Sequence, residues 1–125
     1  MSDEYVFTLP YPPSINSYYG ITCNARIPHK FIKEKGRLYR EAVIGIIKEK
    51  NLDIRANVPL SMTLILTPPD NRTRDIDNGL KCLLDSLTHA NVLEDDKHIR
   101  KLEVSYVEKD NYEKPGSVLI MLKAL

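Results

Sequence analysis

The sequence predicts an α/β fold of the α+β type, with a small mixed β-sheet and two helices in the order β-α-β-α-β-β. Two apolar stripes have helical spacing, and four short apolar segments end at prolines or polar turns. The length of 125 residues corresponds to one domain, which we assign to residues 1–125. The simplest arrangement places both helices on one face of the sheet.

The strands are predicted where β-branched, aromatic or alternating apolar residues gather. They are residues 5–9, 60–67, 99–107 and 117–123. The second of these is bounded by prolines on both sides, at Pro59 and at residues 68–69. Because proline cannot continue a central strand, these prolines mark its two ends. Residues 14–29 are polar and aromatic without clear periodicity, which indicates a loop or a short hairpin.

The helices are predicted from apolar residues that recur at spacings of three and four. The first helix covers about residues 33–50, with a stripe made of Leu38, Tyr39, Ala42, Val43, Ile46 and Ile47. The second covers about residues 77–88, with Leu80, Leu83, Leu84 and Leu87. This leucine spacing outweighs the hairpin turn that the pair at 78–79, Asn-Gly, favours on its own.

Composition excludes several classes of protein. Hydrophobic residues make up 42% and charged residues 28%, which excludes a wholly disordered chain. No apolar run reaches the length of about 18 residues that a membrane span needs. Two cysteines without a CxxC motif indicate neither a disulfide framework nor a zinc site. The acidic N-terminus resembles no targeting signal, so we expect a cytoplasmic protein without a membrane partner.

Charge is distributed unevenly along the chain, although the net charge is only +1. Residues 21–50 carry eight Lys or Arg against three Glu, and residues 94–113 carry seven acidic against four basic residues. One segment can therefore attract a polyanion, while another concentrates carboxylates.

The most informative segment is residues 72–81, which contains Asp75, Asp77 and Lys81. In extended chain, side chains two residues apart point the same way, so the two aspartates can act together if they precede the helix. Two carboxylates on one side repel each other, and both stay ionised only if a cation joins them; otherwise one raises its pKa. Carboxylate oxygens suit Mg²⁺ or Mn²⁺. Lys81 lies one helical turn further on, and residues 94–96 add a second acidic cluster. The combination predicts metal-assisted phosphoryl chemistry.

Each group also has a structural interpretation. Asp75 or Asp77 could cap the second helix, and Lys81 could form an ordinary ion pair with Asp77 or Asp85. The acidic residues 94–96 could form a solvated turn. It is the combination of these features that favours a functional site, since a single DxD motif is weak.

Two segments resemble the RusA-type Holliday junction resolvases. Residues 9–19 (LPYPPSINSYY) are similar to the opening signature of that family, and residues 74–81 (RDIDNGLK) to its central RDxDNxxK motif. Residues 85–87 and 94–96 continue the resemblance at the expected spacing.

The resemblance implies a homodimeric, Mg²⁺-dependent endonuclease that resolves four-way DNA junctions by symmetric paired nicks in recombination and repair. Mn²⁺ is a substitute metal, and no organic cofactor is expected. The essential aspartates of the family map onto Asp75, Asp77 and Asp96, as catalytic residues and metal ligands, and the essential lysine onto Lys81. Asp95 competes with Asp96 for the third position, because Glu94 stands where an apolar residue is expected. A metal ion held there would neutralise the phosphodiester and activate a water.

The basic residues then become candidates for DNA contact. They are, together with one asparagine of the motif, Arg72, Arg74, Asn78, Lys30, Lys33, Lys35 and Arg37. For the four residues of the first helix region, a solvated helix face is the competing interpretation. Tyr11, Tyr18 and Tyr19 could stack on bases, but packing in a core or an interface is the more common use of tyrosine.

Three alternative functions are weighed. A non-catalytic junction- or DNA-binding module would use the acids only as caps and solvated groups. A nuclease that prefers forks or flaps would carry the same motifs. A phosphoacceptor receiver domain needs an acidic pair just after its first strand, whereas here that strand ends in prolines and the site acids lie beyond residue 74.

Overall fold

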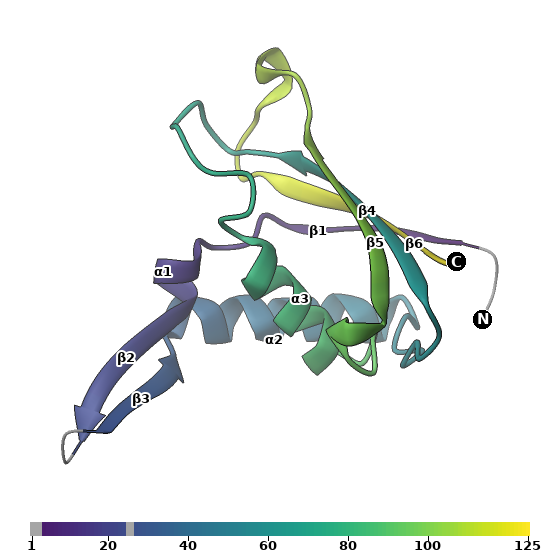
Figure 1. Ribbon diagram of the computed structural model, residues 1–125. Helices are drawn as coiled ribbons and strands as arrows, with labels where there is room; N and C mark the ends of the chain where they lie inside the picture. Colours follow the sequence, from purple (N-terminus) through teal and green to yellow (C-terminus); the bar gives the residue numbers. More distant parts are fainter. Residues whose placement is uncertain (1–3, 25–26) are drawn as a thin grey trace.

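A computed structural model describes residues 4–24 and 27–125, with the backbone alone for residues 22–24 and 27–30. Its main sheet has the order β1-β6-β4-β5, formed by β1 (Tyr5–Pro10), β6 (Ser117–Ala124), β4 (Leu60–Thr67) and β5 (Ile99–Tyr106). β4 and β5 are parallel, and the other two pairs are antiparallel. The sheet is therefore mixed, as predicted, with β1 and β5 at its edges (Figure 1).

Three α-helices accompany the sheet in the described part of the chain: α1 (Ile15–Tyr18), α2 (Glu34–Glu49) and α3 (Leu80–His89). Two short 3₁₀ helices, η1 (Asp96–His98) and η2 (Lys109–Asn111), flank β5. A second sheet consists of the hairpin β2 (Tyr19–Asn24) and β3 (Ile27–Ile32), which projects away from the main body in Figure 1. No helix of the described chain is long and apolar enough to cross a membrane.

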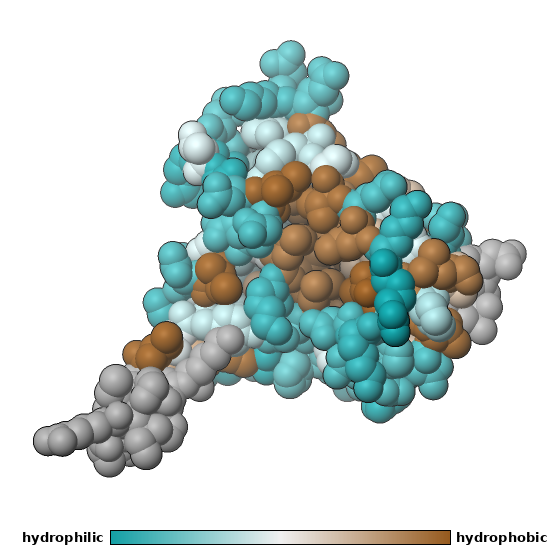
Figure 2. Space-filling view, in the orientation of Figure 1, coloured by the Kyte–Doolittle hydropathy of each residue, from teal (hydrophilic) through white to brown (hydrophobic). Residues whose placement is uncertain are grey.

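The core lies between the sheet and the long helices α2 and α3. Alternate residues of β4, among them Met62, Leu64 and Leu66, are buried on the side that the helices cover. Val43 and Ile47 of α2 and the leucines 83 and 87 of α3 complete this core. The edge strand β5 is less well covered, and Figure 2 shows apolar side chains at the surface between α3 and β5, surrounded by hydrophilic residues.

Both long helices end in the same way, at an asparagine in the left-handed region. After α2, Asn51 has φ 55°, and the N–H of Leu52 donates to the carbonyl of Ile47 over 3.0 Å. After α3, Asn91 has φ 65°, and the N–H of Val92 donates over 3.0 Å to Leu87. These are Schellman motifs, in which the residue after the helix satisfies the last carbonyls and packs on the core.

The predicted strands are confirmed, three of them to within one residue and 60–67 without change. The first helix is also confirmed, and the hairpin alternative for residues 14–29 is correct apart from the added turn of α1. The start of the second helix at residue 77 is wrong, because α3 begins at Leu80. Residues 76–79 form turns instead, so the Asn-Gly pair does act locally as a turn signal.

The two glycines of α2 allow a matched test of how tightly α1 packs on that helix. A Cβ at Gly36 would lie 2.7 Å from Cδ1 of Tyr18 and 2.8 Å from its carbonyl oxygen, whereas a Cβ at Gly45 meets nothing within 4 Å. We expect Gly36→Ala to lower the free energy of unfolding by about 1–3 kcal/mol through overpacking. Gly45→Ala should raise it by about 0.5–1 kcal/mol through helix propensity. Urea unfolding measures both, and equal effects would contradict this packing.

Candidate active site and nucleic-acid interface

The two segments that carry the family resemblance lie against each other. The backbone N–H of Ile15 donates to the carbonyl of Asn78 over 3.0 Å. Pro12 packs so closely on Gly79 that a Cβ there would lie 2.8 Å from the proline Cγ. The proline-rich turn after β1 and the loop after β4 therefore form one surface, although more than 60 residues separate them.

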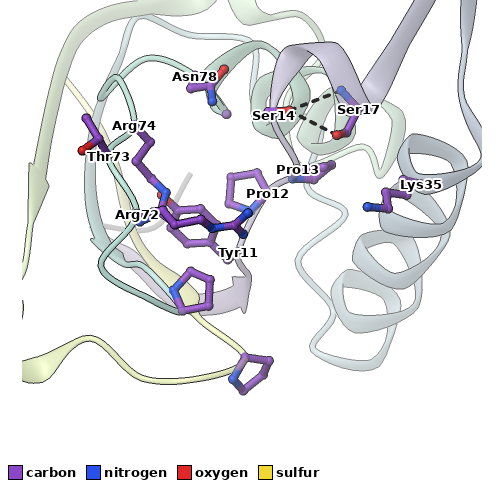
Figure 3. Close-up of a pocket in the computed structure, with 13 residues that line it drawn as sticks. Tyr11, Pro12, Pro13, Ser14, Ser17, Lys35, Arg72, Thr73, Arg74 and Asn78 are labelled. Atoms are coloured by element: carbon purple, nitrogen blue, oxygen red, sulfur yellow. Dashed lines mark hydrogen bonds between the residues drawn. The ribbon is translucent and has the colours of Figure 1, made fainter.

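A pocket of about 450 Å³ opens between these segments, the start of α2 and the turn before β6 (Figure 3). Prolines and Tyr11 supply much of its wall, and Lys35, Arg72 and Arg74 supply three positive charges. No acidic residue is among the residues that line it. Its other polar groups come from Ser14, Ser17, Thr73 and Asn78. Such a cationic concavity suits an anion.

The two arginines of the pocket are organised by Asp70. Nη2 of Arg74 lies 2.6 Å from one carboxylate oxygen of Asp70, and Nε of Arg72 lies 3.2 Å from the other. The backbone N–H of Arg72, and then the two guanidinium groups, hold the pKa of Asp70 well below its usual range. Arg74 is only 15% exposed and lies 5.9 Å from the ring centre of Tyr11, whereas Arg72 is 82% exposed. Arg74 is thus fixed, and Arg72 is accessible to a ligand.

Asp75 opens a turn and Asp77 lies within it, and both precede α3, as expected. The expectation of extended chain is wrong for Asp77. The N–H of Asn78 donates to the carbonyl of Asp75, and the N–H of Leu80 to that of Asp77, both over 3.1 Å. Neither carboxylate caps α3, whose first flanking residue, Gly79, is without a side-chain cap. Within the described residues, both carboxylates are exposed and make no hydrogen bond or ion pair. The capping interpretation is therefore wrong.

The third predicted acid lies elsewhere on the protein. Asp75 and Asp77 are near Tyr106, because their charges add to the rise that burial causes in the pKa of that phenol. Asp96 is near Asp85 instead, and its charge adds to the rise in the pKa of the Asp85 carboxyl. The described residues contain no group of three or more His, Cys, Asp or Glu side chains that could hold a metal ion. A single chain therefore does not present the three predicted ligands as one set.

The parallel sheet explains this separation. The loop with Asp75 and Asp77 follows β4, whereas Asp96 begins η1, which directly precedes β5. In a parallel pair, the C-terminal end of one strand and the N-terminal end of its neighbour lie at opposite ends of the sheet along the strand direction. Tyr106, the last residue of β5, is at the same end of the sheet as the last residues of β4, which is why it is the strand residue near the two aspartates.

Asp95 and Asp96 have different local roles. The Asp95 carboxylate accepts a hydrogen bond of 2.9 Å from the backbone N–H of Lys97 and so caps η1. That hydrogen bond is also the main reason why the pKa of Asp95 is lowered. Asp96 is not the cap of η1, and its side chain adds to the lowering of the Asp95 pKa through a hydrogen bond between the two carboxyl groups.

Lys81 is held by its own helix. Its Nζ lies 3.5 Å from Oδ1 of Asp85, one helical turn further along α3. The other oxygen of Asp85 accepts a hydrogen bond from the hydroxyl of Tyr19, the first residue of β2. Of the two ion pairs predicted for Lys81, the one with Asp85 is the one that forms.

The remaining basic candidates differ in whether they line the pocket. Lys35 lines the pocket and extends toward it from α2 (Figure 3). Lys33 donates to the carbonyl of Asn16 over 2.8 Å, and Arg37 is 3.9 Å from Glu34. The side chain of Lys30 lies outside the described residues. The pocket therefore brings together four of the seven predicted DNA-contact residues: Lys35, Arg72, Arg74 and Asn78.

Two residues of this region were not among the predicted site residues. Asp70 precedes the two arginines by two and four residues, a charge pattern that could have indicated the pair from the sequence. Tyr19 meets Asp85 across 66 positions, and no local pattern signals such a contact.

A cationic pocket beside a loop with two unpaired carboxylates is typical of proteins that bind and process nucleic acid. The model of the family Endodeoxyribonuclease RusA matches residues 10–123. The chain belongs to this family, as its motifs predicted.

Curated relatives agree with this assignment. A crossover junction endodeoxyribonuclease RusA of Enterobacteria phage HK97 is 44% identical over 102 residues, which cover 82% of each chain. Relatives of the same name are 39% identical in Escherichia coli (strain K12) and 40% identical in Enterobacteria phage 82, both over 97 residues and 78% of each chain. The periplasmic domain of Helicobacter pylori MotB gives a TM-score of only 0.38 at 13% identity, over 99% of this chain and 76% of that chain.

Asp70 gives a test of the pocket by pH. Its lowered pKa means that its contribution to stability is fully present above the pKa of an unfolded aspartate, about 3.9, and is lost as pH falls below that value. We expect Asp70→Asn to be less stable than the wild type at pH 7, with the difference shrinking between about pH 4 and pH 2. Urea unfolding across this range measures the difference. Asp110→Asn, at an exposed position, is the control, and a pH-independent difference for Asp70→Asn would contradict the ion-pair network.

Proposed function

We propose that this chain is an endodeoxyribonuclease that resolves four-way DNA junctions by paired symmetric nicks. The observation that carries the proposal is the convergence of the two motif segments on one cationic pocket beside Asp75 and Asp77. The named relatives are crossover junction endodeoxyribonucleases, which supports branched DNA as the substrate. The cytoplasm, expected from the sequence, is the compartment proposed for this activity.

The pocket is proposed to hold the DNA backbone. Its three cations face an open space of about 450 Å³ without a lining acid, and an extended phosphodiester chain has the complementary charge. Arg74 is fixed by Asp70, so Arg72 and Lys35 are the residues with exposed positive groups. Asn78 can donate from its side-chain amide to a phosphate or a base edge.

Catalysis is proposed to depend on Asp75, Asp77, Asp96 and Lys81, with Mg²⁺, or Mn²⁺ in its place, as the cofactor. Asp75 and Asp77 support this role because they are exposed and serve no structural purpose in the described chain. Asp96 is preferred to Asp95, which caps η1. In the described part of one chain, these carboxylates do not form a group of three that could hold the ion. Lys81 is proposed to stabilise negative charge in the transition state.

A homodimer is proposed for two reasons. A four-way junction offers two equivalent scissile sites related by a two-fold axis, which a C₂ dimer matches. A second subunit also provides a further set of the same acids, which a single chain does not assemble.

Nicking of branched DNA tests the catalytic assignment. We expect Asp75→Asn and Asp77→Asn to bind a four-way junction but to cut it about 10³-fold or more slowly, since a lost metal ligand removes several kcal/mol of stabilisation. The assay compares a junction, a fork and linear duplex, each with Mg²⁺, with Mn²⁺ and with chelator. Asp53→Asn, at an exposed position away from the pocket, should cut normally.

The outcomes separate the alternatives. Binding without cutting by the wild type would support a non-catalytic module, and faster cutting of forks would change the preferred substrate. Near-normal cutting by both aspartate variants would reject the proposed active site.

The salt dependence of junction binding tests whether the pocket contacts the phosphate backbone of DNA. The double variant Lys35→Ala/Arg72→Ala should bind junctions more weakly, with a slope of log K against log salt reduced by about 2, because each phosphate contact contributes roughly 0.9. Lys48→Ala, at the far end of α2 from Lys35, should leave the slope unchanged. An unaltered slope in the double variant would place DNA on another surface.

A further inference from the structure

We propose that Asp85 and Tyr19 position the Lys81 ammonium group for its action on the scissile phosphate, as a fixed chain of contacts from β2 to α3. This inference rests on the proposed function, in which Lys81 is a catalytic residue. Asp85 and Tyr19 are positioning residues, since neither is assigned a contact with substrate.

The first step is the contact between Lys81 and Asp85. Nζ of Lys81 lies 3.5 Å from Oδ1 of Asp85, and the lysine side chain is 48% exposed. A lysine on an exposed helix face samples many rotamers, because its side chain has four rotatable bonds and high conformational entropy. A carboxylate one turn away restricts those rotamers and directs the ammonium along α3. Asp85 is itself only 25% exposed, so it is a firmer anchor than a solvated surface acid.

The second step is the contact between Asp85 and Tyr19. The tyrosine hydroxyl donates to Oδ2 of Asp85, which leaves Oδ1 for the lysine. One carboxylate thus has two partners on its two oxygens, and its rotation is restricted. The hydrogen bond joins residues 66 positions apart, so the orientation of Asp85 is set by tertiary structure and not by its own helix alone.

The third step is the support beneath Tyr19. Its ring packs edge-on against that of Tyr18, with the ring centres 4.5 Å apart, and Tyr18 is completely buried. Arg40 of α2 donates to the Tyr18 hydroxyl over 2.8 Å. The series of contacts therefore continues from Arg40 through both tyrosines to Asp85 and Lys81. Four elements of the fold contribute to it: α2, α1, β2 and α3.

The surroundings of Asp85 favour a fixed carboxylate. Its side chain is only 25% exposed, and burial raises its pKa above the usual value, while the nearby His89 opposes the rise and Asp96 adds to it. Its two oxygens contact Lys81 and Tyr19, so the carboxylate is held from two elements at once.

A double-mutant cycle tests the inference on the full-length protein. We expect Asp85→Asn to reduce the single-turnover nicking rate by about 10- to 100-fold, the loss that a displacement of about 1 Å can cause, with little change in junction Kd. Its melting temperature should stay near that of the wild type. Lys81→Met should lose at least as much activity, and Asp85→Asn should cause no further loss in the Lys81→Met background.

Tyr19→Phe is the second variant, because it removes only the hydroxyl. It should slow nicking by a smaller factor than Asp85→Asn, again with unchanged junction Kd. Glu49→Gln, at an exposed position on the last turn of α2, is the matched control and should nick normally.

The results distinguish this inference from the proposed function. If the wild type does not nick, or if Lys81→Met nicks normally, then the proposed role of Lys81 fails. If Lys81→Met is inactive while Asp85→Asn and Tyr19→Phe nick at the wild-type rate, the proposed function stands. The inference that Asp85 and Tyr19 position Lys81 is then overturned. Additive losses in the double variant would also overturn it, since they would show that Asp85 acts independently of Lys81.

Discussion

The parallel pairing of β4 with β5 determines where the predicted site residues lie. Parallel strands need a long crossover, and here the crossover contains both the aspartate loop and α3. The loop follows the C-terminal end of β4, and the chain enters β5 at the opposite end of the sheet, after η1. α3 runs between these two ends, so Lys81 and Asp85, spaced along it, lie between the two acidic groups. A change in this one pairing would move every residue of the motif.

A second constraint is the contact of Pro12 with Gly79. No side chain larger than hydrogen fits there without a shift, and the adjacent hydrogen bond from Ile15 to Asn78 fixes the register of the two segments. The loop that begins after β4 also separates paired charges from unpaired ones. Asp70 neutralises part of the positive charge of Arg72 and Arg74, while Asp75 and Asp77 remain unpaired nearby in the described chain. Two arginines of the cationic pocket and two carboxylates that are unpaired among the described residues therefore lie within one loop.

Local patterns predicted most of the fold because its elements have clear boundaries. Prolines delimit β4, and the apolar stripe of α2 is regular, so both were predicted closely. The start of α3 was misplaced because the turn at residues 76–79 interrupts a periodic pattern that begins only at Leu80. The candidate residues were found by spacing and resemblance, but their arrangement depends on contacts between distant segments. Neither the pocket, which joins Tyr11 to Arg74, nor the bond from Tyr19 to Asp85 has a local signature.

Asp70 and Asp85 show how the same side chain serves opposite purposes in this protein. Hydrogen bonds from Arg72 and Arg74 lower the pKa of Asp70, so its charge stabilises the folded state above about pH 4. Burial raises the pKa of Asp85, in the opposite direction. The contacts of Asp70 stay within the loop after β4, whereas those of Asp85 join Lys81 of the central motif to Tyr19 of the opening motif. A carboxylate held on both oxygens between these two segments has the geometry that a positioning residue for Lys81 requires.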